Sequence, residues 1–381
     1  MCVVGPGKAF LSGMTYHTYG LVSALAAHGP TQAVLLRHLV PGRLYPGRSR
    51  IGSDLSHLRL PPTVERAGRV DWWWGPGMIE ALWMLLRRPP AILVLQWWSA
   101  AVWHTQLTLA IVAKARGARV VIEIHEPMDT AEARVPLAGA WAKVIGRALL
   151  KQADRVIVHG RVAEDVVVEA LLVDRSQIVI IAEPPFDHYQ VDPRCAPEPR
   201  VGEVVELLFF GTIRPFKGLE DLIAAFDQLC ESGDGQQWHL TVVGETWEGW
   251  TLPSARIMQS LYRDRITFVN RYVADEEVDR WFADADLVVL PYHRSFTSGP
   301  LMVAMSYGKP VVVTRVGGLP EAVENYAGAV VVDPQSPDRL VDGIRKAEQL
   351  VGPSYPAPRS WADVANEHEA LYRQLGVEGR S

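Results

Sequence analysis

The chain has 381 residues, of which 48% are hydrophobic and 21% charged, and its formal net charge is −5. A chain of this length predicts about two domains, each large enough to bury its own core. The small negative charge excludes a bulk electrostatic attraction to nucleic acid. Cys2, Cys195 and Cys230 are scattered and odd in number, which argues against a disulfide framework or a structural zinc motif and indicates a reducing compartment.

The opening apolar run covers only residues 1–4, too short for a secretory signal, and no run approaches the ~18 apolar residues of a membrane span. We therefore expect a cytoplasmic protein. Tryptophan is abundant before residue 142, with two interpretations open. One is an aromatic acceptor-binding or membrane-interface surface, helped by Arg87 and Arg88, and the other is a tryptophan-rich core. A peripheral contact with the inner membrane face stays open with the first. The tryptophans concerned are Trp72, Trp73, Trp74, Trp83, Trp97, Trp98, Trp103 and Trp141.

Short β-rich runs alternate with helical patterns along the first half of the chain. Helices are predicted at 14–27 and 138–153. Strands are predicted at 1–4, 33–37, 70–74, 91–97, 120–125, 155–159 and 178–182. Prolines then cluster between 184 and 199, where neither a helix nor a central strand can continue.

A second alternating series follows the proline-rich stretch. Strands are predicted at 204–210, 239–243, 266–269, 287–291, 311–314 and 330–333, and helices at 219–230, 276–285, 301–307, 337–350 and 361–375. Alternation of this kind is typical of a parallel sheet with crossover helices. The sequence thus predicts an α/β fold of two doubly wound domains, with the ligand at the carboxyl ends of the strands in the cleft between them.

Two segments place glycine turns and anion-binding groups directly after predicted strands. The first, Gly211-Thr-Ile-Arg-Pro-Phe-Lys-Gly218, carries Arg214 and Lys217, and two cations in a β-to-α loop suit a diphosphate. The alternative is a surface loop with two solvated cations. In the second, the amides of Ser298 and Gly299 precede a helix that starts near Pro300 and would point at an anion.

Together, residues 211–218 and 295–320 resemble the donor half of a GT-B glycosyltransferase of family four, the retaining group 1 glycosyltransferases that use nucleotide-diphosphate sugars. The likeness extends loosely over nearly the whole chain. It implies a nucleotide-sugar donor as co-substrate and needs neither a metal nor a bound organic cofactor. It also implies a donor site made of Gly13, Gly211, Arg214, Lys217, Tyr272, Val273, Ser295, Thr297, Ser298, Gly299 and Pro300.

The resemblance sets the domain boundaries as well. Residues 1–185 would form an acceptor-binding Rossmann-like domain, 186–203 a proline-rich linker and 204–358 a nucleotide-sugar-binding Rossmann-like domain. The last segment, 359–381, would be a terminal helix that packs back on the first domain.

The chain departs from the family pattern at two positions. The family typically carries two glutamates eight residues apart in the second segment, where this chain has Ser295 and Val303. A valine side chain cannot accept a hydrogen bond from a ribose hydroxyl. Recognition of the nucleotide and sugar must therefore differ from the usual pattern.

The first domain offers fewer signals. The glycine-rich segment 5–13 follows the first strand but lacks the spacing of a P-loop or a dinucleotide-binding motif, and a simple turn is the alternative interpretation. By resemblance, Thr15, Tyr16 and His17 after Gly13 would contact the acceptor. The family places a histidine beside the donor sugar at His125, and Glu126 becomes an acceptor contact. His125-Glu126 is not a zinc motif, since no second histidine follows at helical spacing.

The sequence thus predicts an enzyme, a retaining hexosyltransferase with His125, Arg214 and Lys217 as its catalytic residues. Its acceptor would be a hydroxyl of a small molecule, a lipid-linked molecule or an oligosaccharide. The resemblance implies front-face departure, in which the leaving diphosphate helps to remove the acceptor proton. The main rival is a non-catalytic homologue that binds ligands or partners an active transferase, and a sugar-nucleotide epimerase is a lesser one. No nucleic-acid partner is expected, and the residues specify no oligomeric state.

Overall fold

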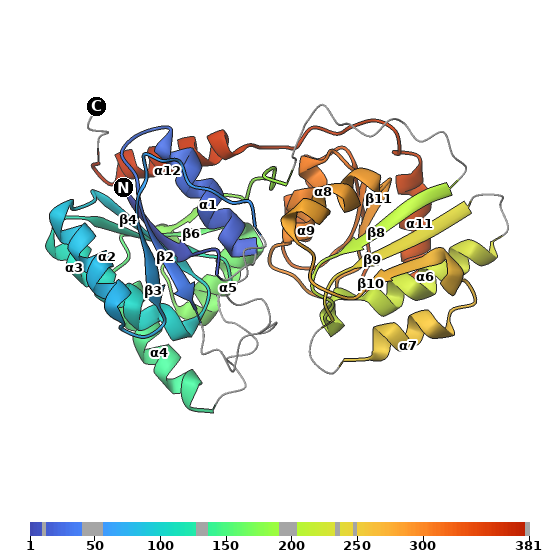
Figure 1. Cartoon of the computed structure of the whole chain (residues 1–381), viewed down its shortest axis with the longest axis horizontal. Helices are drawn as coiled ribbons and strands as arrows, with labels where there is room; N and C mark the ends of the chain where they lie inside the picture. The colour runs from blue at the N-terminus through green and yellow to red at the C-terminus, as the bar shows by residue number, and fades with distance from the viewer. Residues whose placement is uncertain are drawn as a thin grey trace. The chain divides into compact units, whose positions relative to one another are not determined.

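The computed structural model describes residues 1–9, 13–39, 56–126, 136–189, 204–232, 237–246 and 250–377, and it leaves out the side chains of 136–142 and 237. The chain divides into two compact units (Figure 1). Unit 1 comprises Met1–Asp54, Leu58–Glu183 and Ser360–Ser381, and unit 2 comprises Leu55–His57 and Pro184–Arg359. Most of the predicted linker, from residue 190 to 203, lies outside the described residues.

Unit 1 is built on a seven-stranded parallel sheet in the order β3-β2-β1-β4-β5-β6-β7. This is the strand order of a dinucleotide-binding Rossmann domain with one strand added, and the order reverses between β1 and β4. The strands are β1 (Cys2–Pro6), β2 (Gln32–His38), β3 (Glu65–Asp71), β4 (Ile92–Trp97), β5 (Arg119–Ile124), β6 (Arg155–Val158) and β7 (Ile178–Ile180).

The central strands are recognisable in the sequence because helices cover both faces of the sheet. Every residue of β4 is buried, as expected for a near-continuous apolar run inside a parallel sheet. The edge strand β3 was predicted wrongly at 70–74. It ends at Asp71, and the tryptophans follow it. Half-exposed residues weaken the apolar pattern of β3, whereas tryptophan has a high strand propensity, and together these effects moved the prediction.

Helices α1 (Gly13–Ala26), α2 (Pro76–Arg87), α3 (Trp103–Ala115), α4 (Pro136–Leu150) and α5 (Arg161–Leu171) cover this sheet, with short 3₁₀ turns η3 (Ala100–Val102) and η5 (Arg175–Gln177). The last helix, α12 (Trp361–Gln374), also belongs to unit 1 and packs against α1. A capping box starts α12, because Ser360 Oγ accepts from the Asp363 amide and the Asp363 carboxylate accepts from the Ser360 amide.

The tryptophans divide between the two interpretations. Trp97 and Trp103 lie in the core with ring centroids 3.9 Å apart. Trp73, Trp74 and Trp83 are exposed at or before α2. Trp141 lies in the part of α4 whose side chains are not described.

Unit 2 contains a six-stranded parallel sheet in the order β10-β9-β8-β11-β12-β13, again reversing at the centre, between β8 and β11. Its strands are β8 (Val204–Phe210), β9 (Gln237–Val243), β10 (Ile266–Val269), β11 (Leu287–Leu290), β12 (Val311–Thr314) and β13 (Ala329–Val332). Its helices are α6 (Leu219–Glu231), α7 (Leu252–Gln259), α8 (Asp275–Asp284), α9 (Gly299–Ser306), α10 (Leu319–Ala322) and α11 (Pro337–Glu348), with 3₁₀ turns η6 (Pro215–Lys217) and η7 (Arg263–Arg265).

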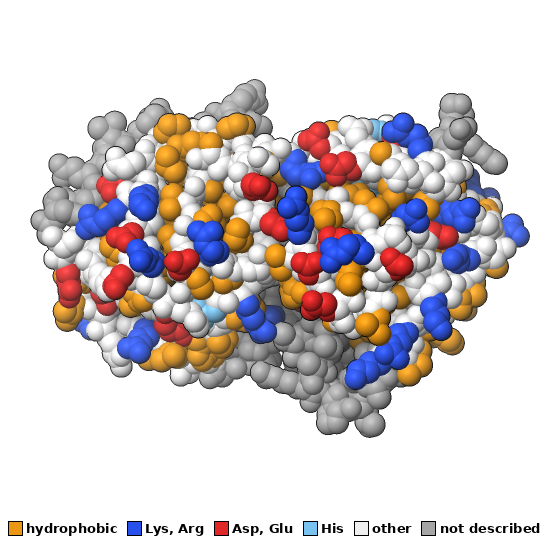
Figure 2. All heavy atoms as spheres, turned by 180° about the vertical axis from the view of Figure 1, so that it is seen from behind, with side chains coloured by type: hydrophobic (Ala, Val, Ile, Leu, Met, Phe, Trp, Pro, Cys, Tyr) orange, Lys and Arg blue, Asp and Glu red, His pale blue; other side chains and the backbone are white. Residues whose placement is uncertain are grey.

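Both units therefore have Rossmann-like topology, which confirms the predicted α/β class with two doubly wound domains. On the face drawn in Figure 2, Lys and Arg side chains are interspersed with Asp and Glu over the described surface of each unit. Among the described residues, no helix has the length and apolar character needed to cross a membrane.

Candidate functional site

The best-defined candidate site lies at the centre of the unit 2 sheet, where the strand order reverses. Strands β8 and β11 are neighbours there, and the chain leaves their carboxyl ends in opposite directions. In open α/β sheets, ligands bind outside the carboxyl ends at this position. The loops after β8 and β11 are the two segments that the sequence singled out.

These two loops are held together by backbone contacts. The His293 amide donates to Phe216 O at 2.8 Å. Gly218 closes the first loop with φ +65°, and a Cβ on it would lie 1.9 Å from Pro291 O. Only glycine permits both this conformation and this close approach. Gly218, directly after η6, therefore sets the distance between the loops.

Positive charge gathers around these loops. Lys217 Nζ lies 3.8 Å from the ring centroid of the buried Tyr292. The Arg214 and Arg294 guanidinium carbons lie 5.8 Å and 4.7 Å from the ring centroid of Phe216. Arg294 was not singled out from the sequence, although its position five residues before Gly299 is a usable signal. Three cations on neighbouring loops can neutralise a diphosphate.

The amino terminus of α9 adds backbone donors to the same area. Ser298 is its N-cap, and its side chain accepts from the Leu301 amide at 3.3 Å. Gly299 and Pro300 form the first turn, and a Cβ on Gly211 would lie 3.1 Å from Pro300 Cγ, so this turn adjoins the end of β8. The first amides of a helix lack intrahelical partners and carry the positive end of its dipole.

The remaining donor-site predictions fall around this centre. Ser295 Oγ donates to Thr297 O at 2.7 Å, which fixes the loop before α9. Val303 is buried within α9. Tyr272 is half-buried and Val273 buried just after β10, two strands away from β8. The structure brings the unit 2 candidates to one edge of one sheet, and their roles in binding stay predictions.

The predicted residues of unit 1 have different surroundings. Gly13 is exposed at the start of α1, whereas Thr15, Tyr16 and His17 are buried in its first turns. Glu126 is half-buried after β5. His125 is buried as well, with 5% of its surface exposed. Contact of Thr15, Tyr16 and His17 with an acceptor stays a prediction.

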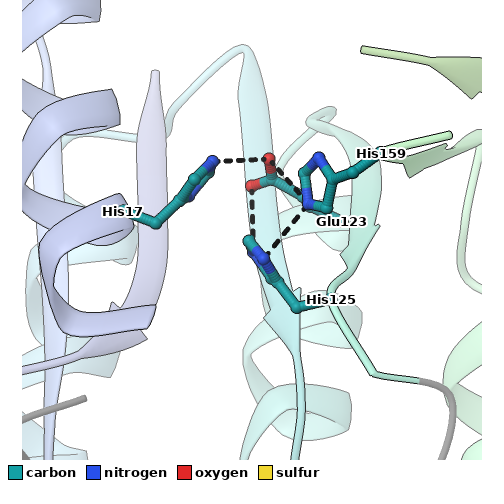
Figure 3. A group of neighbouring side chains, drawn as sticks. All are labelled: His17, Glu123, His125 and His159. Atoms are coloured by element: carbon teal, nitrogen blue, oxygen red, sulfur yellow. Dashed lines mark hydrogen bonds and ion pairs between the residues drawn. The ribbon is translucent and has the colours of Figure 1, made fainter. Parts of the chain in front are cut away.

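His17 and His125 meet in a buried cluster that also contains Glu123 and His159 (Figure 3). His17 projects from α1, Glu123 and His125 come from the end of β5, and His159 follows β6. Each residue offers one ligand-type atom, and these atoms all lie within 4.8 Å of one another. We call these four residues the histidine cluster.

The neighbours of the cluster restrain its side chains. His159 Nδ1 donates to Ile181 O at 2.9 Å, and His125 Nδ1 lies 3.1 Å from Glu183 Oε1. Gln96 Nε2 lies 3.1 Å from His17 Nδ1 and 3.4 Å from Glu123 Oε2. Burial lowers the pKa of His17 well below its usual range and lowers that of His159. Burial also raises the pKa of the Glu123 carboxyl to about 7.

Glu123, His159, Gln96 and Glu183 were not predicted as functional residues. No local motif joins them, since they come from β4, β5 and the segments after β6 and β7. A signal was nevertheless present, because Glu123 is a lone carboxylate inside the apolar strand sequence Val-Val-Ile-Glu-Ile. A charged residue in a central strand is rare unless a partner compensates it.

Two family models match the chain. Residues 12–183 match "Glycosyl transferase 4-like domain" and residues 205–349 match "Glycosyl transferases group 1". The chain belongs to the group 1 glycosyltransferases. The family predicted from the sequence is thus confirmed. The match to residues 205–349 contains both loops of the unit 2 site.

Similar proteins agree with this assignment. A D-inositol 3-phosphate glycosyltransferase from Segniliparus rotundus is 30% identical over 178 residues, 43% of this chain and 39% of that protein. The chain spans between 36% and 58% of the length of the curated relatives it matches.

Solved structures resemble the chain over almost its whole length. Sucrose-phosphate synthase from Thermosynechococcus elongatus has a TM-score of 0.63 and 17% identity, and the likeness covers 98% of each chain. HepE from Anabaena, in complex with UDP, has a TM-score of 0.62 and 16% identity over 98% of this chain and 94% of that one. These likenesses confirm the predicted fold, GT-B with two Rossmann-like domains.

Proposed function

We propose that this group 1 glycosyltransferase transfers a hexosyl group from a nucleotide-diphosphate sugar to a hydroxyl acceptor, with retention at the anomeric carbon. One observation carries the proposal. The loops after β8 and β11, which hold Arg214, Lys217 and the first turn of α9, are joined at the point where the unit 2 strand order reverses.

The chemistry proposed for this site is charge stabilisation. When the glycosidic bond to the donor breaks, negative charge grows on the leaving diphosphate. Arg214, Lys217 and the α9 amides would stabilise that charge, and the diphosphate would help to take the acceptor proton from the same face. Tyr272 and Val273 would cover the nucleotide base. The UDP bound to the structural neighbour HepE supports a nucleotide ligand for this fold.

Lys217 is the best residue for a first test. Its Nζ lies over the Tyr292 ring, and among the described residues no carboxylate pairs with it. Thermal melting should therefore be measured with UDP, GDP, dTDP and ADP, each alone and as a sugar conjugate. A nucleotide at about 100 times its Kd adds ~2.7 kcal/mol of stability. We expect Lys217→Ala to lose most of this shift.

Lys346→Ala is the matched control, because Lys346 is an exposed lysine in α11 of the same unit. A Lys217→Ala protein that binds the nucleotide as well as the wild type would overturn the donor-site assignment. Binding without formation of any glycoside or free sugar would instead favour a non-catalytic homologue. The presence of Ser295 and Val303 in place of the two family glutamates is the observation that favours a non-catalytic homologue as the second candidate function.

The acceptor is proposed to contact unit 1. One face of α2 carries three exposed apolar side chains, Ile79, Trp83 and Leu86, at helical spacings. The guanidinium carbon of Arg87 lies 4.9 Å from the centroid of the Trp83 ring. Such a face suits a lipid-linked or aromatic acceptor. Comparing turnover of a lipid-linked and a water-soluble acceptor in wild type and Trp83→Ala tests this, since an equal effect on both would contradict a role in lipid recognition.

A further inference from the structure

Within the described part of unit 1, the histidine cluster contains more hydrogen-bond acceptor atoms than N–H protons to share among them. His159 Nδ1 donates its proton in a hydrogen bond to Ile181 O, so the neutral ring presents an unprotonated Nε2 to the cluster. His125 Nδ1 lies 3.1 Å from His159 Nε2 and 3.1 Å from Glu183 Oε1. A single proton on His125 Nδ1 cannot form a good hydrogen bond to both of these acceptors. The unprotonated nitrogens and the carboxylates in and beside the histidine cluster therefore face one another without enough protons or cations between them.

Two buried atoms in the described cluster also lack hydrogen-bond partners. They are Glu123 Oε1 and His125 Nε2, on side chains that are 1% and 4% exposed. Glu123 Oε1 faces His17 Nε2 at 3.5 Å and His159 Nε2 at 3.9 Å, both too long for a hydrogen bond. A buried polar atom without a partner is costly, so each one requires an explanation.

We propose that His17, Glu123, His125 and His159 bind one divalent transition-metal ion, with Zn²⁺ as the best match. Three imidazoles and one carboxylate are a zinc ligand set. Magnesium and calcium prefer oxygen ligands, and the cluster has no thiolate that would select a softer metal.

The geometry needs only local adjustment to accept the ion. Zinc binds histidine nitrogen at 2.0–2.1 Å in a tetrahedral site, which places neighbouring ligand atoms about 3.3 Å apart. The distance from His17 Nε2 to Glu123 Oε1, 3.5 Å, already approaches this value. The longer separations, up to 4.8 Å, shorten when the side chains turn toward the ion.

The outer contacts are of the kind that support metal ligands. The bond from His159 Nδ1 to Ile181 O fixes the tautomer that exposes Nε2, and the Glu183 carboxylate lies 3.1 Å from His125 Nδ1, where it can hold the proton that leaves His125 Nε2 free. Gln96 Nε2 donates to the Glu123 carboxylate at 3.4 Å. The unprotonated ring nitrogen that this tautomer of His159 presents is the form in which imidazole binds a metal.

The proposed ion would join α1 to the ends of β5 and β6, all within unit 1. The metal proposal depends only on residues of unit 1, so its test is independent of the proposed donor site in unit 2.

Zinc content and affinity test the proposal. Untagged wild-type protein grown with zinc should retain about one zinc ion per chain after desalting, as measured by mass spectrometry of the metal. After removal of the metal with a chelator, zinc titration should restore it and raise the melting temperature. Second-shell changes weaken metal sites about 10–100-fold, so loss of a ligand in His159→Gln or Glu123→Gln should cost at least about 100-fold in affinity.

His239→Gln is the matched control, because His239 also pairs with a carboxylate, Glu206, at 2.9 Å but lies in unit 2. Its zinc affinity should equal that of the wild type. Equal zinc affinity in wild type, His159→Gln and Glu123→Gln would overturn the proposal and leave a metal-free hydrogen-bond network.

Cobalt keeps the test decisive if the variants do not fold. Metal-free wild type titrated with Co²⁺ should develop visible d–d absorption of a tetrahedral nitrogen and oxygen site, and zinc should displace it. Absence of that absorption would overturn the proposal. Nucleotide binding measured in the same samples reports on the donor site separately.

Discussion

Gly218 is the residue at which the geometry of the two loops proposed to bind the donor can be tested most directly. Replacing it with alanine introduces two separate costs. The left-handed backbone conformation, with φ +65°, costs a residue with a Cβ about 1–2 kcal/mol. The new Cβ would also lie 1.9 Å from Pro291 O, and relieving such overpacking typically costs about 1–3 kcal/mol.

We therefore expect Gly218→Ala to lower the free energy of unfolding by about 2–5 kcal/mol. Gly117→Ala separates the two costs, because Gly117 has φ +88° but nothing within 4 Å of its Cβ position. The control should lose only about 1–2 kcal/mol. Urea unfolding of both variants measures the difference.

The same substitution should weaken nucleotide binding. Pro291 can yield only by moving away from Gly218, and that movement separates Lys217 from the loop before α9. We expect at least about a tenfold loss of affinity for the nucleotide that stabilises the wild type, equivalent to about 1.4 kcal/mol. A Gly218→Ala protein that matches Gly117→Ala in stability and wild type in affinity would refute the argument.

Three further predictions concern stability. Burial lowers the pKa of His188 to about 3, so below pH 6.5 the unfolded chain binds a proton that the native state excludes, and stability falls as pH falls. Between pH 8 and pH 5 wild type should lose up to about 2 kcal/mol more than His188→Phe in urea unfolding, and parallel pH profiles would contradict this. Gly20→Ala should loosen α12, because its Cβ would lie 2.2 Å from the Trp361 ring; limited proteolysis should show faster loss of α12 than in Gly29→Ala, whose Cβ position is open. Ser360→Ala removes the N-cap of α12 and should cost about 1 kcal/mol in urea unfolding, whereas no change would exclude a capping contribution.

Much of the fold was predictable because the strands of a parallel sheet are apolar runs that can be recognised in the sequence. The predicted strands 204–210, 266–269 and 311–314 coincide with β8, β10 and β12, whose apolar runs are bounded by turn residues. Helices α2, α3, α5, α7 and α10 were not among the predicted helices, and β3 was displaced. The boundary signal is weak in α3, which starts directly after a 3₁₀ turn and lacks a side-chain N-cap.

That the two loops of unit 2 lie together was predictable for a different reason. Each loop is continuous in sequence, so glycine, cation and helix-start signals stand side by side between Gly211 and Gly218 and around Gly299. The histidine cluster has no such continuity. Its members are separated by 106 residues between His17 and Glu123 and by 34 between His125 and His159, and only the parallel strand order brings them together.

Each unit provides a rigid base for a segment that is proposed to face a ligand, and the two do so by different physical means. In unit 2 the loop after β8 is held by backbone contacts, and Gly218 makes the close approach to Pro291 O. In unit 1 the start of α1, the helix after β1, is fixed by a side chain. His17 lies one turn after Gly13, and its ring packs in the buried histidine cluster. Rossmann domains bind ligands at the turn between the first strand and its helix. A cation at the cluster would therefore stiffen the first turns of α1, where Thr15 and Tyr16 are predicted to contact the acceptor.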